Sequence, residues 1–421
     1  MSGNCEITGL SPEDVNLFSN LHSHIIGTLE MATPTKEEFA AYDKPLGYTV
    51  SNHKFNTGDI KRKDSLINHL EKSISSKFKG SKLTAFGSSE SGLSLKTGDL
   101  DLCLQLPGAD QKKIVKRISG MLRGQGMESV QALTRATVPI VKFTDPRSGM
   151  EVDISINNNL ALHNTSLLKA YADKDERVRK LAICVKHWAL HRNISDAHSG
   201  TFSSYAWSVL VINHLIKSGI IPNLQSSTAR TIVEIDEKEY DITINTDAKV
   251  DSPATTTLTE LLYSFFHDYA TMDWENEIIS IRNGSTLSRD QKGWMNETPS
   301  ALDVVNSKKE KPPRMGEHHL SIEDPFNPEH DLCRVVRAVG ELKIRDELLR
   351  AAKLFGDGTS WKMICETIEP DRLQNMEPAD IFHDLRDKSD DFVKEMLGKT
   401  KIEMSEVLSL IHISEPTRLG M

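Results

Sequence analysis

Residues 86–104, FGSSESGLSLKTGDLDLCL, decide the fold of this chain. Near the end of this stretch, leucines alternate with Asp99 and Asp101, which is the pattern of a strand with one apolar and one acidic face. Upstream, Gly87 and Ser88 end another apolar strand in a turn of small residues, whose amides and hydroxyl suit a phosphate group. The stretch therefore predicts two strands joined by a turn, the second of which presents two carboxylates.

A third carboxylate follows in residues 151–156, EVDISI, where Asp153 projects from one face and apolar side chains pack on the other. A lone D-x-D is a weak signal, but the Gly-Ser turn before it and the isolated aspartate after it strengthen it. Three carboxylates with oxygen ligands only suit Mg²⁺. Two such ions about 4 Å apart clamp an in-line phosphoryl displacement. We therefore predict that Asp99, Asp101 and Asp153 hold two Mg²⁺ ions, with Mn²⁺ as a substitute.

The chain divides into an α/β part and a mostly helical part. Its patterns predict helices near 11–31, 61–79 and 110–125, strands at 138–145 and 151–156, helical stripes over 165–220, a hairpin within 229–247, a helix at 258–272, a loop at 307–319 and a helical block from about residue 328. The predicted domains are an N-terminal segment 1–50 packing on the helical part, an α/β domain 51–165, a helical domain 166–365 and an acidic extension 366–407. Residues 408–421 look like a translated sequencing adaptor, so we expect a non-native tail.

Composition bounds the class of protein. The net charge of −9 over 421 residues argues against a broad basic surface for nucleic acid. Residues 51–147 nevertheless hold about eight more Lys and Arg than Asp and Glu, which suits a polyphosphate and a short RNA. The five cysteines form no C-x-x-C pair, and no apolar run or N-terminal leader suggests a membrane span or export. We expect a cytoplasmic protein, with the nucleus as the alternative.

The stretch 86–104, with further motifs over roughly residues 55–365, resembles the DNA polymerase beta superfamily, and within it the noncanonical poly(A) polymerases and terminal uridylyltransferases. The resemblance implies an α+β protein: a polymerase-beta-like nucleotidyltransferase domain and a helical poly(A)-polymerase-associated domain, with the active site between them. It also implies template-independent addition of nucleotides to RNA 3′ ends. Asp99 and Asp101 would hold both metals, and Asp153 would help to activate the RNA 3′-hydroxyl.

The same resemblance assigns the nucleotide-binding positions. They are Gly87, Ser88, Asn158, Asn164, Thr165, Lys186, Ser204, Tyr205, Asp324 and His330. Ser88, Lys186 and Ser204 would contact the triphosphate. Asn164 and Thr165 would address the ribose hydroxyls, although an Asn-Thr pair before a helix also fits a helix cap.

The base would lie on Tyr205, which supplies stacking affinity and little selectivity; a plain core role is the alternative for this tyrosine. Asn158 would touch the uracil edge, and Asp324 and His330 in IEDPFNPEHDLCR would read the base. Uracil presents the acceptor O4, whereas adenine presents a donor amine, so a histidine N–H favours UTP. Arg334, expected on the same helical face as His330, would meet RNA or phosphate.

One position departs from the family. Where its members commonly carry a second lysine one helical turn after Lys186, this chain has Leu190. His191 and Arg192 are candidates to replace that charge.

The sequence therefore predicts an RNA uridylyltransferase that adds UMP from UTP and releases pyrophosphate, possessing no membrane segment and acting as a monomer with RNA-targeting protein partners. A poly(A) polymerase using ATP is the alternative. An inactive RNA-binding scaffold is a third, which the complete set of three aspartates argues against.

Overall fold

The computed structural model describes residues 33–136, 138–250, 255–294, 320–336 and 338–368. The predicted helix at 11–31, the loop at 307–319, nearly all of the C-terminal extension and the tail lie outside these residues.

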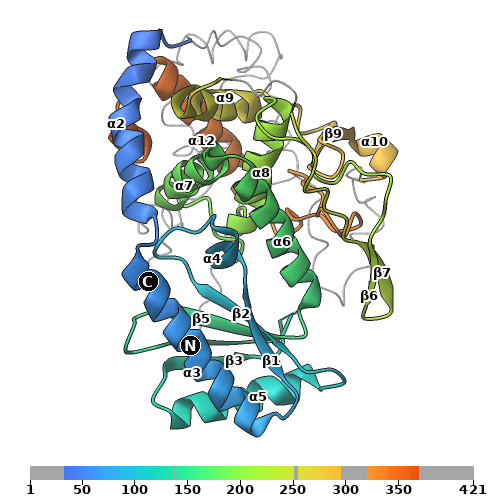
Figure 1. Cartoon of the computed structure of the whole chain (residues 1–421). Helices are drawn as coiled ribbons and strands as arrows, with labels where there is room; N and C mark the ends of the chain where they lie inside the picture. The colour runs from blue at the N-terminus through green and yellow to red at the C-terminus, as the bar shows by residue number, and fades with distance from the viewer. Residues whose placement is uncertain (1–32, 137, 251–254, 295–319, 337, 369–421) are drawn as a thin grey trace, which may run out of the picture.

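A five-stranded sheet forms the lower half of the molecule in Figure 1. Its strands are β1 (Lys82–Phe86), β2 (Leu100–Gln105), β3 (Glu128–Leu133), β4 (Ile140–Thr144) and β5 (Glu151–Ile156), in the order β1-β2-β5-β4-β3. Only β2 and β5 pair in parallel. The predicted strands are confirmed, but β3 was missed, because this edge strand is mostly solvent-exposed and lacks a strong apolar alternation.

Two helices cover one face of this sheet. α3 (Thr57–Lys77) is capped by Asn56, and α5 (Gln111–Gly124) is capped by Asp110. Their apolar stripes pack on the leucines, isoleucines and valines that alternate along β2 and β5, and these side chains form one continuous core. The acidic side chains of the same strands therefore point to the opposite face, away from α3 and α5.

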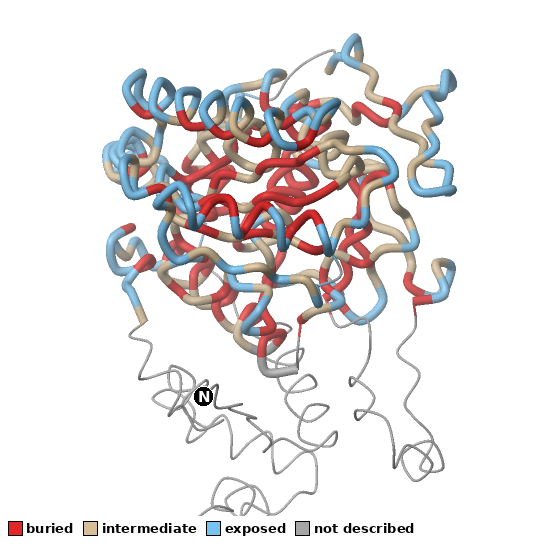
Figure 2. Tube along the Cα trace, turned by 90° about the horizontal axis from the view of Figure 1, so that it is seen from below, coloured by how far each residue is buried: buried red, intermediate tan, exposed pale blue. Residues whose placement is uncertain are grey.

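The helical part has its own core, into which apolar faces of several helices are buried. Figure 2 shows buried residues gathered in the interior of the described part of the chain, with exposed residues around them. These helices are α2 (Lys36–His53), α6 (Asn159–Lys174), α7 (Glu176–His191), α8 (Ser204–Lys217), α9 (Leu258–Ala270), α12 (Ala338–Gly356) and α13 (Trp361–Ile364). Tyr42 of α2 stacks on Phe355 of α12 with ring centroids 4.0 Å apart. A helix from the beginning of the chain is thus fixed to one from its far end by aromatic packing.

Short elements complete the fold. They are α4 (Ser88–Ser91), α10 (Arg289–Lys292), and two hairpins made of β6 (Ile232–Ile235) with β7 (Lys238–Asp241) and β8 (Glu277–Ser280) with β9 (Ser285–Ser288). None of the helices that the structure describes has the length and apolar character needed to cross a membrane.

The predicted helix start near Pro328 is wrong, because α12 begins ten residues later, at Ala338. The carboxylates of Asp324 and Asp331 each accept hydrogen bonds from two backbone amides of neighbouring residues. Such side-chain bonds stabilise turns in competition with a helix. Residues 320–336 consequently form a compact loop, held to β8 by a bridge between Ile279 and Ile322.

Candidate active site

The carboxylates lie in one row across the sheet. Asp101 of β2 is paired in register with Asp153 of β5, which is paired in turn with Lys142 of β4. On the other side, Asp101 is paired with Phe86, the last residue of β1. Asp99 directly precedes β2, on the same side of the strand as Asp101. The structure thus brings the three predicted aspartates together.

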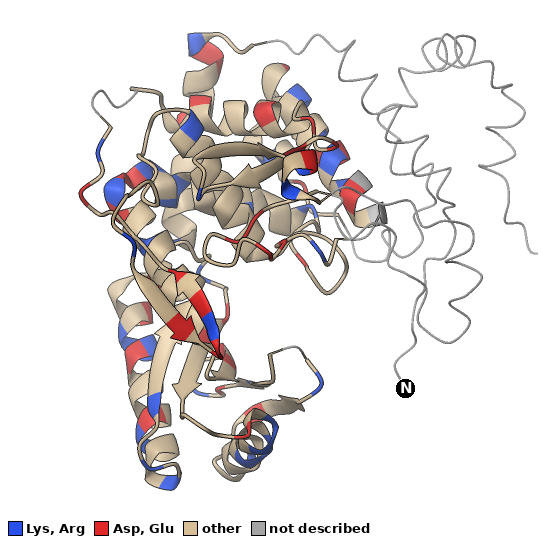
Figure 3. Cartoon of the chain, turned by 90° about the vertical axis from the view of Figure 1, so that its right-hand side faces the viewer, with Lys and Arg blue, Asp and Glu red and all other residues tan. Residues whose placement is uncertain are grey.

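Lys142 is a site residue that the sequence analysis missed. Its Nζ lies 3.2 Å from Asp153 Oδ2 and 3.8 Å from Asp99 Oδ2. Acidic and basic segments accordingly lie side by side on the strands in Figure 3. Its signal was present, since Lys142 alternates with buried Val141 and Phe143, but only the pairing of β4 with β5 places it beside the aspartates.

The row holds more negative charge than its surroundings neutralise. Burial, reinforced by Asp153 and Asp99, raises the pKa of Asp101 to about 7. Burial also raises the pKa of Asp153, against the opposing effect of Lys142. In addition, Asp153 Oδ1 is buried without a hydrogen-bond partner among the described residues. A cluster of oxygen ligands in this state fits hard divalent cations such as Mg²⁺.

The described residues include no three His, Cys, Asp or Glu side chains already arranged as a metal cage. At the aspartates, the Lys142 ammonium lies where it contacts two of the three carboxylates. A cation at this row would share two of its carboxylates with Lys142.

The turn after β1 is packed directly on the carboxylates. Gly87 has φ +77°, and a Cβ at this position would overlap Oδ2 of Asp101. The Gly87 amide donates to Thr165 Oγ1 at 2.8 Å, and that hydroxyl donates to the carbonyl of Ala161 at 2.7 Å. Ser88 begins α4 at this turn. Glycine suits this position because a side chain would be strained at this backbone conformation and would displace the Asp101 carboxylate.

Asn164 and Thr165 lie inside α6, which begins at Asn159, so the capping alternative for this pair is wrong. The hydroxyl of Thr165 holds the Gly87 turn. Asn164 Nδ2 lies 3.4 Å from Asp324 Oδ2, and its Oδ1 is buried without a described partner. Asn158 is the N-cap residue of α6 and makes no side-chain capping bond. Asn158 and Asn164 thus retain hydrogen-bonding capacity for a ligand.

Lys186 is almost fully buried, and its Nζ donates to the carbonyl of Leu93 at 2.8 Å. Burial lowers the pKa of Lys186 to about 7, although Asp101 acts in the opposite direction. One turn later, Leu190 is 48% exposed. The predicted substitution by Arg192 is wrong: its Nε and Nη2 bind Glu347 at 2.8 and 2.6 Å, away from solvent.

His191 is no clear replacement either, because its Nδ1 lies 2.8 Å from the carbonyl of His187, one turn earlier in the same helix. Arg192 therefore does not supply the missing charge, whereas the replacement of that charge by His191 stays a prediction.

Two of the residues predicted to contact the base, Asp324 and Tyr205, lie close together, and Asn164 of α6 lies 3.4 Å from Asp324. The Asp324 carboxylate is buried, which raises its pKa, and its Oδ1 accepts from the amides of Phe326 and Asn327. Tyr205, near the start of α8, packs against the helical core, and its hydroxyl is buried without a described partner. Burial first, and Asp324 second, raise the pKa of Tyr205. Tyr205 can therefore pack against the core and also form an edge of the site.

His330 and Arg334 lie in the same loop, with Arg334 Nη1 3.0 Å from His330 Nδ1. They are neighbours across a turn and do not share a helical face, which corrects the expected geometry. Ser204, the first residue of α8, is exposed. Its expected phosphate contact and those of the other nucleotide-binding residues stay predictions.

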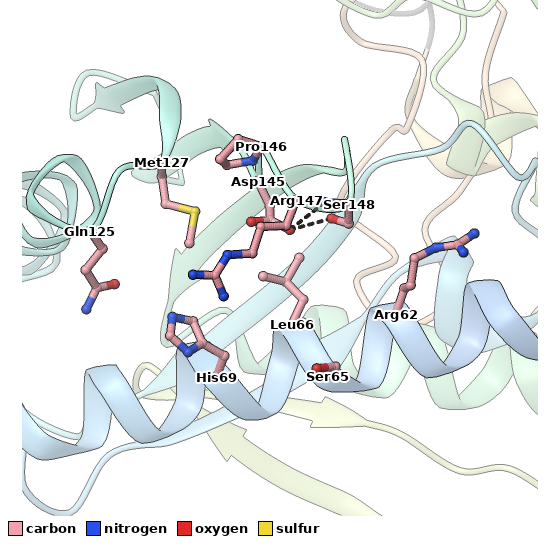
Figure 4. Close-up of a pocket in the computed structure, with 10 residues that line it drawn as sticks. All are labelled: Arg62, Ser65, Leu66, His69, Gln125, Met127, Asp145, Pro146, Arg147 and Ser148. Carbon is pink, nitrogen blue, oxygen red and sulfur yellow. Dashed lines mark hydrogen bonds between the residues drawn. The ribbon is translucent and has the colours of Figure 1, made fainter.

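A separate cavity of about 180 Å³ lies between α3 and the β4–β5 turn. Figure 4 shows Arg62, His69 and Arg147 around it, with the carboxylate of Asp145 in its wall. Arg62 is paired with Asp59. This cavity adjoins the helices that cover the back of the sheet, and it contains none of the predicted site residues.

Two family models match the chain: "Poly(A) RNA polymerase, mitochondrial-like, central palm domain" over residues 46–173, and "Cid1 family poly A polymerase" over residues 257–330. Terminal uridylyltransferase cid1 of Schizosaccharomyces pombe is 30% identical over 360 residues, which cover 81% of this chain and 85% of cid1. Poly(A) RNA polymerase GLD2-A of Xenopus laevis is 32% identical over 318 residues, 70% of this chain and 56% of that protein.

Solved structures agree. A cytoplasmic RNA terminal U-transferase shares 29% identity with a TM-score of 0.67, covering 80% of this chain and all of that one. Cid1 in complex with the UTP analogue UMPNPP shares 28% identity with a TM-score of 0.63, covering 75% and 93%.

The sheet, its row of aspartates and the helical part define a polymerase-beta-like nucleotidyltransferase. More narrowly, the chain belongs to the family of terminal uridylyltransferases and noncanonical poly(A) polymerases.

Proposed function

We propose that this protein adds UMP from UTP to RNA 3′ ends and releases pyrophosphate. One observation carries the proposal: a continuous path of contacts joins the carboxylate row to the base-reading loop. Asp101 packs against Gly87, Gly87 bonds to Thr165, and the adjacent Asn164 contacts Asp324. A nucleotide with its phosphates at the aspartates and its base near His330 fits this arrangement.

Asp99, Asp101 and Asp153 would hold two Mg²⁺ ions, for which Mn²⁺ would substitute. When bound, such ions stabilise the charge that develops on the attacking and leaving oxygens. A Cid1 structure with Mg²⁺ and 3′-dATP supports the use of a divalent cation.

The protein's own side chains would orient the reaction. The RNA 3′-oxygen attacks the α-phosphorus, the bond from that phosphorus to the bridging oxygen breaks, and pyrophosphate leaves. Asp153 would help to activate the 3′-hydroxyl by accepting its proton, and the lack of a described partner for its Oδ1 supports this role. Ser88, Lys186 and Ser204 would hold the triphosphate.

Base selection would rest on Tyr205 and the loop. Tyr205 would stack under either base, while Asn158, Asp324 and His330 would read its edge. A histidine N–H matches the acceptor O4 of uracil and opposes the amine of adenine. A solved Cid1 structure from work on UTP selectivity carries a histidine-to-asparagine substitution with MgATP bound, which supports a role for a histidine in this selection.

A poly(A) polymerase is the second candidate. It is favoured by the similarity to poly(A) RNA polymerase cid11 of Schizosaccharomyces pombe and to GLD2-A. We further propose a cytoplasmic monomer that relies on RNA-targeting partners; the net charge of −9, which argues against a broad basic surface for RNA, supports the need for such partners.

Extension of a short labelled RNA with Mg²⁺ and each nucleoside triphosphate in turn tests the proposal. Extension mainly by UTP is expected. Extension mainly by ATP would establish the second candidate, the poly(A) polymerase. No extension by any nucleotide would favour an inactive RNA-binding scaffold. Each reaction is repeated with Mn²⁺ in place of Mg²⁺.

A further inference from the structure

His330 is held by a loop whose backbone is fixed around it. Its amide donates to the carbonyl of Asn327 at 2.8 Å, and its carbonyl accepts from the amide of Asp324 at 3.0 Å. The buried Asp331 carboxylate binds two more backbone amides of the same loop. The backbone position of His330 is therefore set before any nucleotide arrives.

The ring has a second constraint. Arg334 Nη1 lies 3.0 Å from Nδ1 of His330. A guanidinium has donors only, so Nδ1 has to accept, and the proton of the neutral ring has to lie on Nε2. Burial, and the adjacent charge of Arg334, also lower the pKa of His330, which disfavours a second proton on the ring.

We propose that Arg334 is a positioning residue for base selection: by occupying Nδ1 of His330 it fixes the tautomer in which Nε2–H is a donor. This inference deepens the proposed function and rests on it. A fixed Nε2–H matches uracil O4 and opposes the adenine amine, which is also a donor.

The contribution of Arg334 is mainly the exclusion of ATP. Without this arginine, the proton can move to Nδ1, and Nε2 becomes an acceptor that suits adenine. With the arginine present, moving the proton to Nδ1 loses the hydrogen bond between Arg334 and His330, and it places an N–H of each residue opposite the other. Uracil binding changes little in either case, because the Nε2–H tautomer stays accessible.

Kinetic measurement of Arg334→Met tests this directly. We expect kcat/KM for ATP to rise relative to that for UTP by about tenfold, the effect of one hydrogen bond. Arg334→Lys keeps a donor and should restore part of the selectivity. Lys238→Met is the matched control, because Lys238 Nζ binds Asn327 in the same loop at 3.1 Å and does not bind His330. It should leave the ratio unchanged.

An equal loss for both nucleotides in Arg334→Met, with a raised KM for RNA, would overturn the proposal and make Arg334 an RNA contact. The proposal would be supported if Arg334→Lys restored the ratio of kcat/KM for the two nucleotides and Lys238→Met left that ratio unchanged.

The tautomer itself is read from the imidazole ¹⁵N shifts of the nucleotide-free protein, with His330 assigned from the His330→Asn spectrum. We expect the proton on Nε2 in the wild type and a mixture of tautomers in Arg334→Met. A mixture already present in the wild type would refute the inference. This measurement involves no nucleotide. A wild type that prefers ATP would contradict the proposed function, but the tautomer of His330 would still be determined independently.

Discussion

Two acidic regions face the same site, and their buried carboxylates differ in the hydrogen bonds that they accept. On the sheet, Asp101 and Asp153 lie side by side with raised pKa values, and Asp153 Oδ1 lacks a described partner. In the loop 320–336, burial also raises the pKa of Asp324, but Asp324 and Asp331 are more deeply buried and each accepts hydrogen bonds from two backbone amides.

The difference separates two tasks. The sheet brings together negative charges that cations would stabilise. This arrangement suits phosphoryl transfer and is independent of which base the nucleotide carries. The loop uses its carboxylates to fix a backbone, which suits the reading of a base by His330. The account therefore predicts that changes on the sheet affect all nucleotides equally, whereas changes in the loop affect the choice among them.

The largest expected effect is that of Asp153→Ala. Loss of a metal-binding carboxylate that also accepts a proton should lower kcat by about 10³-fold or more, equally with UTP and ATP. Single-turnover extension of labelled RNA measures it. Asp64→Ala, which removes an exposed carboxylate of α3, should retain activity. Substantial activity of Asp153→Ala would remove this residue from the catalytic set.

Gly87→Ala should have the next largest effect. A methyl group here meets Oδ2 of Asp101 and is strained at φ +77°. We expect roughly 10–100-fold lower kcat with both nucleotides. The matched control is Gly80→Ala, since Gly80 has φ +81° with no atom within 4 Å of a Cβ. If both variants lose activity equally, backbone strain rather than contact with Asp101 is responsible.

Leu190→Lys should have a smaller effect in the opposite direction. The position is exposed and one helical turn from Lys186, so a lysine there adds a charge without burial. We expect the KM for UTP and for ATP to fall together by about three- to tenfold. Leu190→Gln separates charge from polarity. A lower KM for only one of the two nucleotides would place Leu190 near the base and contradict this interpretation.

The last predicted effect is on the stability of the fold and not on activity. An aspartate whose folded pKa is raised to about 7 destabilises the fold when charged, so Asp101→Asn should stabilise the metal-free protein by about 2–4 kcal/mol at pH 8. This gain is full above pH 7 and shrinks as the pH falls towards about 4, because folded Asp101 takes up its proton first. Denaturant unfolding in EDTA at several pH values measures it. A destabilised variant at pH 8 would show that the carboxylate is not strained.

The sheet was predictable and the loop was not, for a physical reason. Asp101 and Asp153 alternate with apolar residues on strands, so local period alone assigns their face. Lys142 needed the register of β4 on β5, which only the folded sheet supplies. The loop was mistaken for a helix because Asp324 and Asp331 bind backbone amides.

The ion pair between Arg192 and Glu347 could likewise not be predicted from the sequence, since these residues lie 155 positions apart. Contacts of this kind depend on how helices far apart in the sequence pack together, and no local pattern reports them.

A competition experiment tests the central claim, that chemistry lies on the sheet and selection in the loop. Wild type and His330→Asn are given UTP and ATP at equal concentration, and the added nucleotides are counted by sequencing the RNA. The account predicts mostly uridylate with the wild type and a shift of about tenfold towards adenylate in the variant, at a similar total rate of addition. A large fall in the total rate of addition in His330→Asn, with an unchanged ratio of uridylate to adenylate in the remaining product, would contradict it.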